Sequence, residues 1–149
     1  MVDHNYPDRM IRGISNKNCI FEDTVTAELF TEFKDTGRTD EFKELSISWL
    51  DNDGALRSVL EQTKEDGTLQ FKYGAAILMR DEIDKQKLKN KLINTLLSYE
   101  RSPLNANPYH GNLLLKNDAN RLHKYMVASA LALNCFQRII TSVEEYNNK

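Results

Sequence analysis

Three residues of this 149-residue chain could carry chemistry, although they lie far apart in the sequence: Arg12, Ser46 and His110. Arg12 stands in a short apolar segment, where a guanidinium needs a polar or anionic partner because burying it alone is costly. A bound ligand could be that partner, and a structural salt bridge to a carboxylate is the alternative. An arginine in such a place is therefore a candidate anion-binding residue.

His110 follows Asn-Pro-Tyr and precedes a glycine and a strand-like segment. A loop that leads into a rigid element can hold an imidazole in place, as functional loops require. Because histidine changes charge near neutral pH, it is a candidate acid or base. The alternative is a histidine that only binds the backbone of its own loop.

Ser46 and Ser48 alternate on the polar side of a predicted strand, as ordinary half-exposed strand serines do. The sequence assigns no base beside either hydroxyl, so it does not support a nucleophile by itself. His4 and His123 are not predicted to be functional. A zinc site built from Cys19, His110 and Cys135 lacks the closely spaced ligand pair that structural zinc sites have, so neither a metal nor a cofactor is expected.

Periodicity places these residues on strands and loops. Apolar residues over 9–14 predict a first strand, and strict alternation over 42–50 and 69–79 predicts two more. A brief strand is expected over 111–116, after an irregular stretch that contains two prolines. Arg12 would then lie on the first strand, Ser46 on the second and His110 at the start of the last.

Helical spacing predicts two amphipathic helices, over 55–64 and from Asp81 to before Pro103, and more weakly a short helix over 22–33. A long terminal helix is expected from Asn117 onward. Its apolar residues form two adjacent stripes, which predict either packing across the sheet or an oligomer interface. The fold class is therefore α+β, one domain over residues 1–149, with a mixed or antiparallel sheet of about four strands and a frayed tail over 1–8.

Composition limits the partners of the protein. Twenty basic and twenty-two acidic residues give a net charge of −2, so no strong field attracts nucleic acid or an anionic membrane. No window approaches the eighteen uninterrupted apolar residues typical of a membrane span, and the first residues lack the apolar core of a signal peptide. Two distant cysteines fit a reducing compartment. We expect a cytoplasmic protein with a protein partner, with no membrane association and no bound nucleic acid.

The order of several short motifs resembles a family of small uncharacterised bacterial proteins. That family has an Arg-x-Ile strand, an Ala-Phe segment, a Leu-Ser-Val strand and an Asn-Pro-x-His-Ala turn, followed by an alanine-rich helix. The matching pieces here cover residues 12–14, 27–30, 45–47, 74–76 and 107–111. This sequence departs from the pattern with Leu29 before Phe30 and with Gly111, where the family has alanine. The resemblance implies that Arg12, Ser46 and His110 converge.

An arginine that ends one strand and a Ser-x-Ser on another are also similar to the first two elements of ADP-ribosyltransferases. In that family the arginine helps to bind the dinucleotide phosphates and the serine braces the site. The third element, a glutamate that orients the ribose, is missing here, and only Glu82 or Glu100 could replace it. The similarity covers two short motifs and no more.

Two functions follow from these observations. The first is a regulatory or binding module that acts through a protein partner, for example in immunity or defence, because the familiar catalytic motifs are absent. The second is a small enzyme that acts on a nucleotide or another phosphate-bearing ligand, with Arg12 binding the anion and His110 serving as acid or base. The sequence leaves both open, and convergence of Arg12, Ser46 and His110 in one pocket would favour the enzyme.

Overall fold

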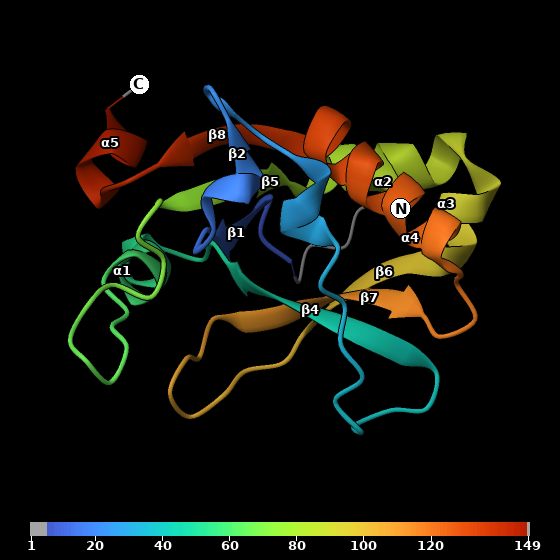
Figure 1. Ribbon diagram of the computed structural model, residues 1–149, viewed down its shortest axis with the longest axis horizontal. Helices are drawn as coiled ribbons and strands as arrows, with labels where there is room; N and C mark the ends of the chain where they lie inside the picture. Colours follow the sequence, from blue (N-terminus) through green and yellow to red (C-terminus); the bar gives the residue numbers. More distant parts are fainter. Residues whose placement is uncertain (1–5, 149) are drawn as a thin grey trace.

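The computed structural model describes residues 6–148, which form a single α+β domain around a curled, antiparallel six-stranded sheet (Figure 1). Its strand order is β6-β7-β4-β1-β5-β8. The strands are β1 (Arg9–Gly13), β4 (Phe42–Trp49), β5 (Ala75–Met79), β6 (Leu97–Arg101), β7 (His110–Lys116) and β8 (Phe136–Ile140). β2 (Ile20–Phe21) and β3 (Thr24–Val25) form a separate pair. The predicted fold class is confirmed, whereas the prediction of about four strands is wrong.

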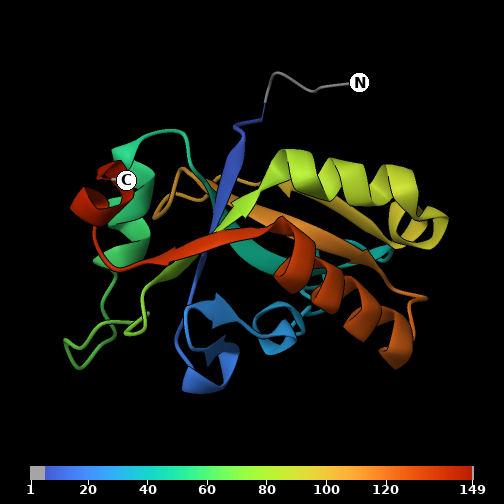
Figure 2. The ribbon, with the colours of Figure 1, turned by 90° about the horizontal axis from the view of Figure 1, so that it is seen from above.

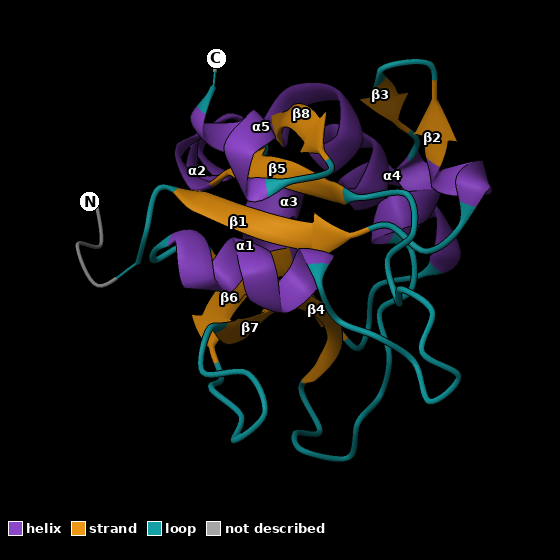
Figure 3. Cartoon of the chain, turned by 90° about the vertical axis from the view of Figure 1, so that its left-hand side faces the viewer, coloured by secondary structure: helices purple, strands orange, loops and turns teal. Residues whose placement is uncertain are grey.

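Five α-helices cover both faces of the sheet within residues 6–148 (Figures 2 and 3). They are α1 (Asp53–Leu60), α2 (Arg80–Lys89), α3 (Lys91–Leu96), α4 (Arg121–Ala130) and α5 (Val143–Asn147). Successive side chains of β1 point to opposite faces. Met10 joins the core formed with α2, α3 and α4, and Ile11 joins the core formed with α1 and α5. No helix in this part of the chain is long and apolar enough to cross a membrane.

The start of the described chain is held by aromatic and ionic contacts. The ring of Tyr6 packs against Trp49 and Tyr99, with centroid distances of 4.8 and 5.2 Å. The buried guanidinium of Arg80 donates to the carbonyl of Pro7 at 2.9 Å and pairs with Asp8. Residues 1–5 of the predicted tail lie outside the described residues, whereas Tyr6, Pro7 and Asp8 are tied to the large core.

The predicted terminal helix ends at Cys135, and a strand and a short helix, α5, follow it. α4 continues through a π-helical turn (Leu131–Cys135), and the chain then enters β8, which pairs with β5. The two apolar stripes belong to two kinds of element, because pairing with a neighbouring strand overrides helical spacing. Leu122 and Leu133 are 76% and 81% exposed. An oligomer formed through this segment stays a prediction.

Three other predicted elements are also corrected. The strand expected over 69–79 begins only at Ala75, because Gly74, at φ +92°, turns the chain just before it. The helix expected after Asp81 is split where the side chain of Asn90 caps α3, and the chain then forms β6 beside β7. The segment 22–33 contains β3 and a 3₁₀ turn (Ala27–Phe30) in place of a helix.

A buried thiol makes stability fall at alkaline pH. Burial raises the pKa of Cys135 to about 12, from an ordinary 9.0. As the pH rises, the unfolded chain therefore loses this proton before the folded chain does. The contribution of the protonated thiol to the free energy of unfolding is complete below about pH 9 and is lost as the pH rises toward 12. We expect Cys135→Ala to flatten the decline of the free energy of unfolding above pH 9, measured by urea denaturation from pH 8 to 11. Parallel declines in both proteins would contradict this assignment.

Candidate functional site

Ser46 lies on the polar side of β4, over the half of the sheet that α1 and α5 leave open. Leu45, Ile47 and Trp49 point into the large core, so the residues between them point to the opposite face. Ser46 is exposed there, whereas Ser48 is buried. The alternation predicted for this strand is confirmed, and it places the Ser46 hydroxyl at an accessible surface.

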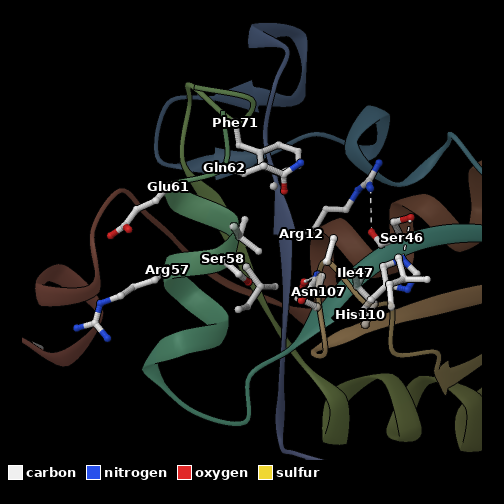
Figure 4. Close-up of a pocket in the computed structure, with 16 residues that line it drawn as sticks. Arg12, Ser46, Ile47, Arg57, Ser58, Glu61, Gln62, Phe71, Asn107 and His110 are labelled. Atoms are coloured by element: carbon white, nitrogen blue, oxygen red, sulfur yellow. Dashed lines mark hydrogen bonds between the residues drawn. The ribbon is translucent and has the colours of Figure 1, made fainter. Parts of the chain in front are cut away.

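His110 begins β7, the neighbouring strand, and is held at both ring nitrogens. It pairs with Ser48 across the two strands, which places Ser46 on the diagonal. Nδ1 lies 2.9 Å from the backbone oxygen of Ser102, and Nε2 lies 3.3 Å from the hydroxyl oxygen of Ser46 (Figure 4). Because a carbonyl can only accept, Nδ1 must carry the proton. In the neutral ring, Nε2 is then the acceptor that faces Ser46.

The loop before His110 fixes the position of the imidazole. Asn107 organises this loop: its side-chain oxygen accepts from the backbone of Tyr109, and its amide donates to the hydroxyl of Ser48 at 3.1 Å. The backbone amide of His110 donates to Asn107, and that of Ser102 donates to His110. These hydrogen bonds hold the loop in place, and the contact of Nδ1 with Ser102 is the loop-backbone bond that the alternative interpretation of His110 also expects. The role of Asn107 was missed, although an asparagine before a proline is a turn signal.

Arg12 bridges two strands where their pairing ends. β1 pairs with β5 along its whole length, but with β4 only at Met10 and Ile11. Beyond that point Nη1 of Arg12 donates to the backbone oxygen of Ser46 at 2.9 Å, and Nε donates to that of Leu29 at 3.2 Å. Burial lowers the pKa of the guanidinium, and the nearby Glu32 partly opposes this shift. The backbone carbonyls supply the partners that the sequence required.

Replacing Arg12 with methionine should therefore lower stability. The variant leaves the oxygens of Ser46 and Leu29 without their donor, and each hydrogen bond from a charged group contributes about 1.5–3 kcal/mol. We expect a loss of roughly 3 kcal/mol in the free energy of unfolding, measured by urea denaturation. Arg9→Met, on the same strand, is the control, because among residues 6–148 the partners of the Arg9 side chain are the backbone of Asp8 and the exposed Asp81. Equal losses in the two variants would contradict the bridging role.

Arg12, Ser46 and His110 line one cavity of about 700 Å³ between α1, the open face of the sheet and the loop before β7 (Figure 4). The same three residues also line an adjoining recess of about 340 Å³. Phe71 packs directly over Gly13 in the wall, where a Cβ atom would lie 2.4 Å from the ring. The side chains of Arg57 and Glu61 point away from His110 (Figure 4). The convergence implied by the resemblance is therefore present in the structure.

A charged cluster beside the cavity was not predicted. Arg38 forms ion pairs with both Glu44 and Glu100, and the amide of Asn112 donates to Glu100 at 2.9 Å. Glu44 is only 8% exposed, because Arg38 and Thr36 cover its carboxylate. The sequence carries no signal for this contact, since Arg38 lies in an irregular loop. Glu44 and Asn112 of this cluster line the adjoining recess.

Comparisons with known protein families, with curated protein sequences and with solved structures give no match. Of the two glutamates considered for an ADP-ribosyltransferase site, Glu100 lies on the same face as Ser46 but is paired with Arg38. Glu82 lies on α2, on the other side of the sheet, and pairs with Lys85.

The zinc site considered from the sequence finds no support. Within residues 6–148, no group of three or more His, Cys, Asp or Glu side chains is placed to hold a metal ion. Cys135 is buried, and burial also raises the pKa of Cys19. A thiol with a raised pKa is less often present as the thiolate that binds metal.

Proposed function

We propose that the cavity beside α1 is the active site of a small enzyme that acts on a nucleotide or a similar phosphate-bearing ligand. His110 serves as the acid or base, and Arg12 binds the anionic group. The observation that carries this proposal is the fixed imidazole of His110, whose Nδ1 binds the Ser102 carbonyl while Nε2 faces an exposed hydroxyl. Proton transfer requires a base that one group orients and that faces the group whose proton it takes; here these groups are the Ser102 carbonyl and the Ser46 hydroxyl.

The cavity also suits the ligand class. Its volume of about 700 Å³ lies in the range of small-molecule sites. Nε and Nη1 of Arg12 are engaged by backbone oxygens, while Nη2 has no acceptor among the described residues. A guanidinium held in this way loses little freedom when it binds an anion. The ring of Phe71, in the same wall, offers an apolar surface against which the nucleobase of a nucleotide could pack.

Thermal unfolding in the presence of AMP, ADP or NAD tests the ligand class. At least one of them should raise the melting temperature of the wild-type protein, because a ligand that binds only the folded state stabilises it. Arg12→Lys should lose most of this increase, since lysine cannot keep both backbone contacts and bind phosphate. Arg121→Lys, on the helix that covers the opposite face, should retain it. No increase with any of the three, or an equal loss in both variants, would refute the proposal.

The protein-partner module, with its possible role in defence, stays a prediction. Its support is a set of exposed leucines on the elements that cover the other face of the sheet: Leu88, Leu122 and Leu133. Single exposed leucines are ordinary on protein surfaces. A pull-down with the wild-type protein and with His110→Ala distinguishes the binding module from the enzyme. A binding module should retain a stoichiometric partner in both pull-downs.

A further inference from the structure

We infer that Ser46 is the nucleophile of this site and forms a covalent intermediate with the phosphorus of its ligand. This inference rests on the proposed function and goes beyond it, because the proposal requires only that His110 moves a proton. Ser46 was a candidate from the sequence, but no base was assigned beside its hydroxyl. The fold supplies that base from a residue 64 positions away along the chain.

The geometry is that of an activated hydroxyl. Nε2 of His110 lies 3.3 Å from the Ser46 oxygen, within the looser distances that nucleophile and base show without ligand. The Ser102 carbonyl fixes the tautomer in which Nε2 accepts the Ser46 proton. Serine is a weak nucleophile until an adjacent base takes this proton. Two contacts therefore connect a nucleophile, a base and an orienting group.

The other serine hydroxyls that line the cavity are either buried or bonded elsewhere, and they lack a contact with a base in the described part of the chain. Ser48 is 4% exposed, and its oxygen accepts from the amide of Asn107. Ser58 donates to the backbone of Ala55 within α1. Neither has a hydrogen bond to a base among the described residues. Ser46 combines exposure with such a contact.

The reaction consumes water and no other co-reactant. The Ser46 oxygen bonds to phosphorus as the bond from phosphorus to the leaving oxygen breaks. The serine proton passes to Nε2 of His110 and then to the leaving oxygen. Water attacks the phosphoserine in turn, gives its proton to His110, and the Ser46 oxygen leaves and regains a proton. Arg12 lies beside this strand and can offset charge on the other phosphate oxygens.

A fluorophosphonate, which presents a phosphorus electrophile with fluoride as the leaving group, tests Ser46 directly. Incubation with the full chain, followed by intact mass and peptide mapping, should give a single adduct on the Ser46 peptide. Ser46→Ala should give none, and His110→Gln should be labelled about 100-fold more slowly. Ser58→Ala, which changes a hydroxyl in the same cavity, should be labelled at the wild-type rate. Circular dichroism confirms that each variant is folded.

Three outcomes would overturn the inference: no adduct where trypsin is fully labelled, an adduct on another residue, or equal rates in the wild-type protein and His110→Gln. Failure here is distinguishable from failure of the proposed function. If nucleotides stabilise the protein but Ser46 is not labelled, only the covalent step is wrong. If Ser46 is labelled but no nucleotide binds, the ligand class is wrong and the nucleophile stands.

Discussion

Replacing His110 with glutamine should lower the rate of turnover of a stabilising nucleotide by a factor of about 10²–10⁴, the usual contribution of a general acid or base. Glutamine can still donate to the Ser102 carbonyl and fill much of the same space, so the loop should keep its shape. It cannot take up and release a proton at neutral pH. The measurement is kcat/KM for the wild-type protein and the variant, with release of phosphate from AMP or ADP, or of AMP from NAD, followed over time.

His123→Gln is the matched control for this experiment. His123 lies on α4, outside the cavity, and its Nδ1 has no hydrogen-bond partner among the described residues. Its replacement should leave kcat/KM within about twofold of the wild-type value, as expected for a residue away from the chemistry. A His110→Gln variant that turns over as fast as the wild-type protein would remove His110 from the mechanism and leave it as a loop-fixing residue.

Replacing Gly111 with alanine should strongly lower the stability of the fold. Gly111 follows His110 in β7, and a Cβ atom there would lie 2.3 Å from the indole nitrogen of Trp49 and 2.5 Å from the backbone oxygen of Glu100. That nitrogen donates to the same oxygen at 3.0 Å, so the new methyl group would break a hydrogen bond in a fully buried place. We expect a loss of about 3 kcal/mol in the free energy of unfolding, at the upper end for overpacked cores.

Gly67→Ala is the control that separates the steric clash of a new Cβ atom from the conformational cost of replacing a glycine. Gly67 has a φ of +87° and no atom within 4 Å of a built Cβ, so only the conformational cost of about 1 kcal/mol should appear. Urea denaturation of both variants gives the comparison. If Gly111→Ala is no less stable than Gly67→Ala, the close packing of Trp49 on β7 is contradicted.

Local patterns predicted the strands that carry the site. Alternation around Ser46 and the turn residues before His110 are short-range signals, and both elements lie where these signals placed them. β8 and β6 could not be found in this way. Their apolar residues fit helical spacing as well, and only pairing with β5 and β7 makes them strands. The helix-rich prediction for these segments failed for that reason.

The contacts within the site depend on register, which the sequence does not specify. Ser46 lies diagonally opposite His110 because β4 and β7 pair Ser48 with His110, and a shift by one residue would turn Ser46 to the core. Arg12 was predicted to need a carboxylate or a ligand, but its partners are backbone oxygens exposed where two strands separate. Arg38 gave no signal at all, because its partners Glu44 and Glu100 come together only in the folded sheet.

An NMR titration of the ¹⁵N-labelled protein with ADP tests whether this cavity binds a phosphate-bearing ligand. Binding in the cavity should give concentration-dependent shifts at Arg12, Gly13, Ser46 and His110, with the side-chain signal of Arg12 among the largest, and small changes along α4. Saturation of these shifts would place a phosphate-bearing ligand in the cavity. Shifts confined to the α4 surface, or none at millimolar ADP, would contradict the claim that this cavity is the active site and would favour a protein-binding module.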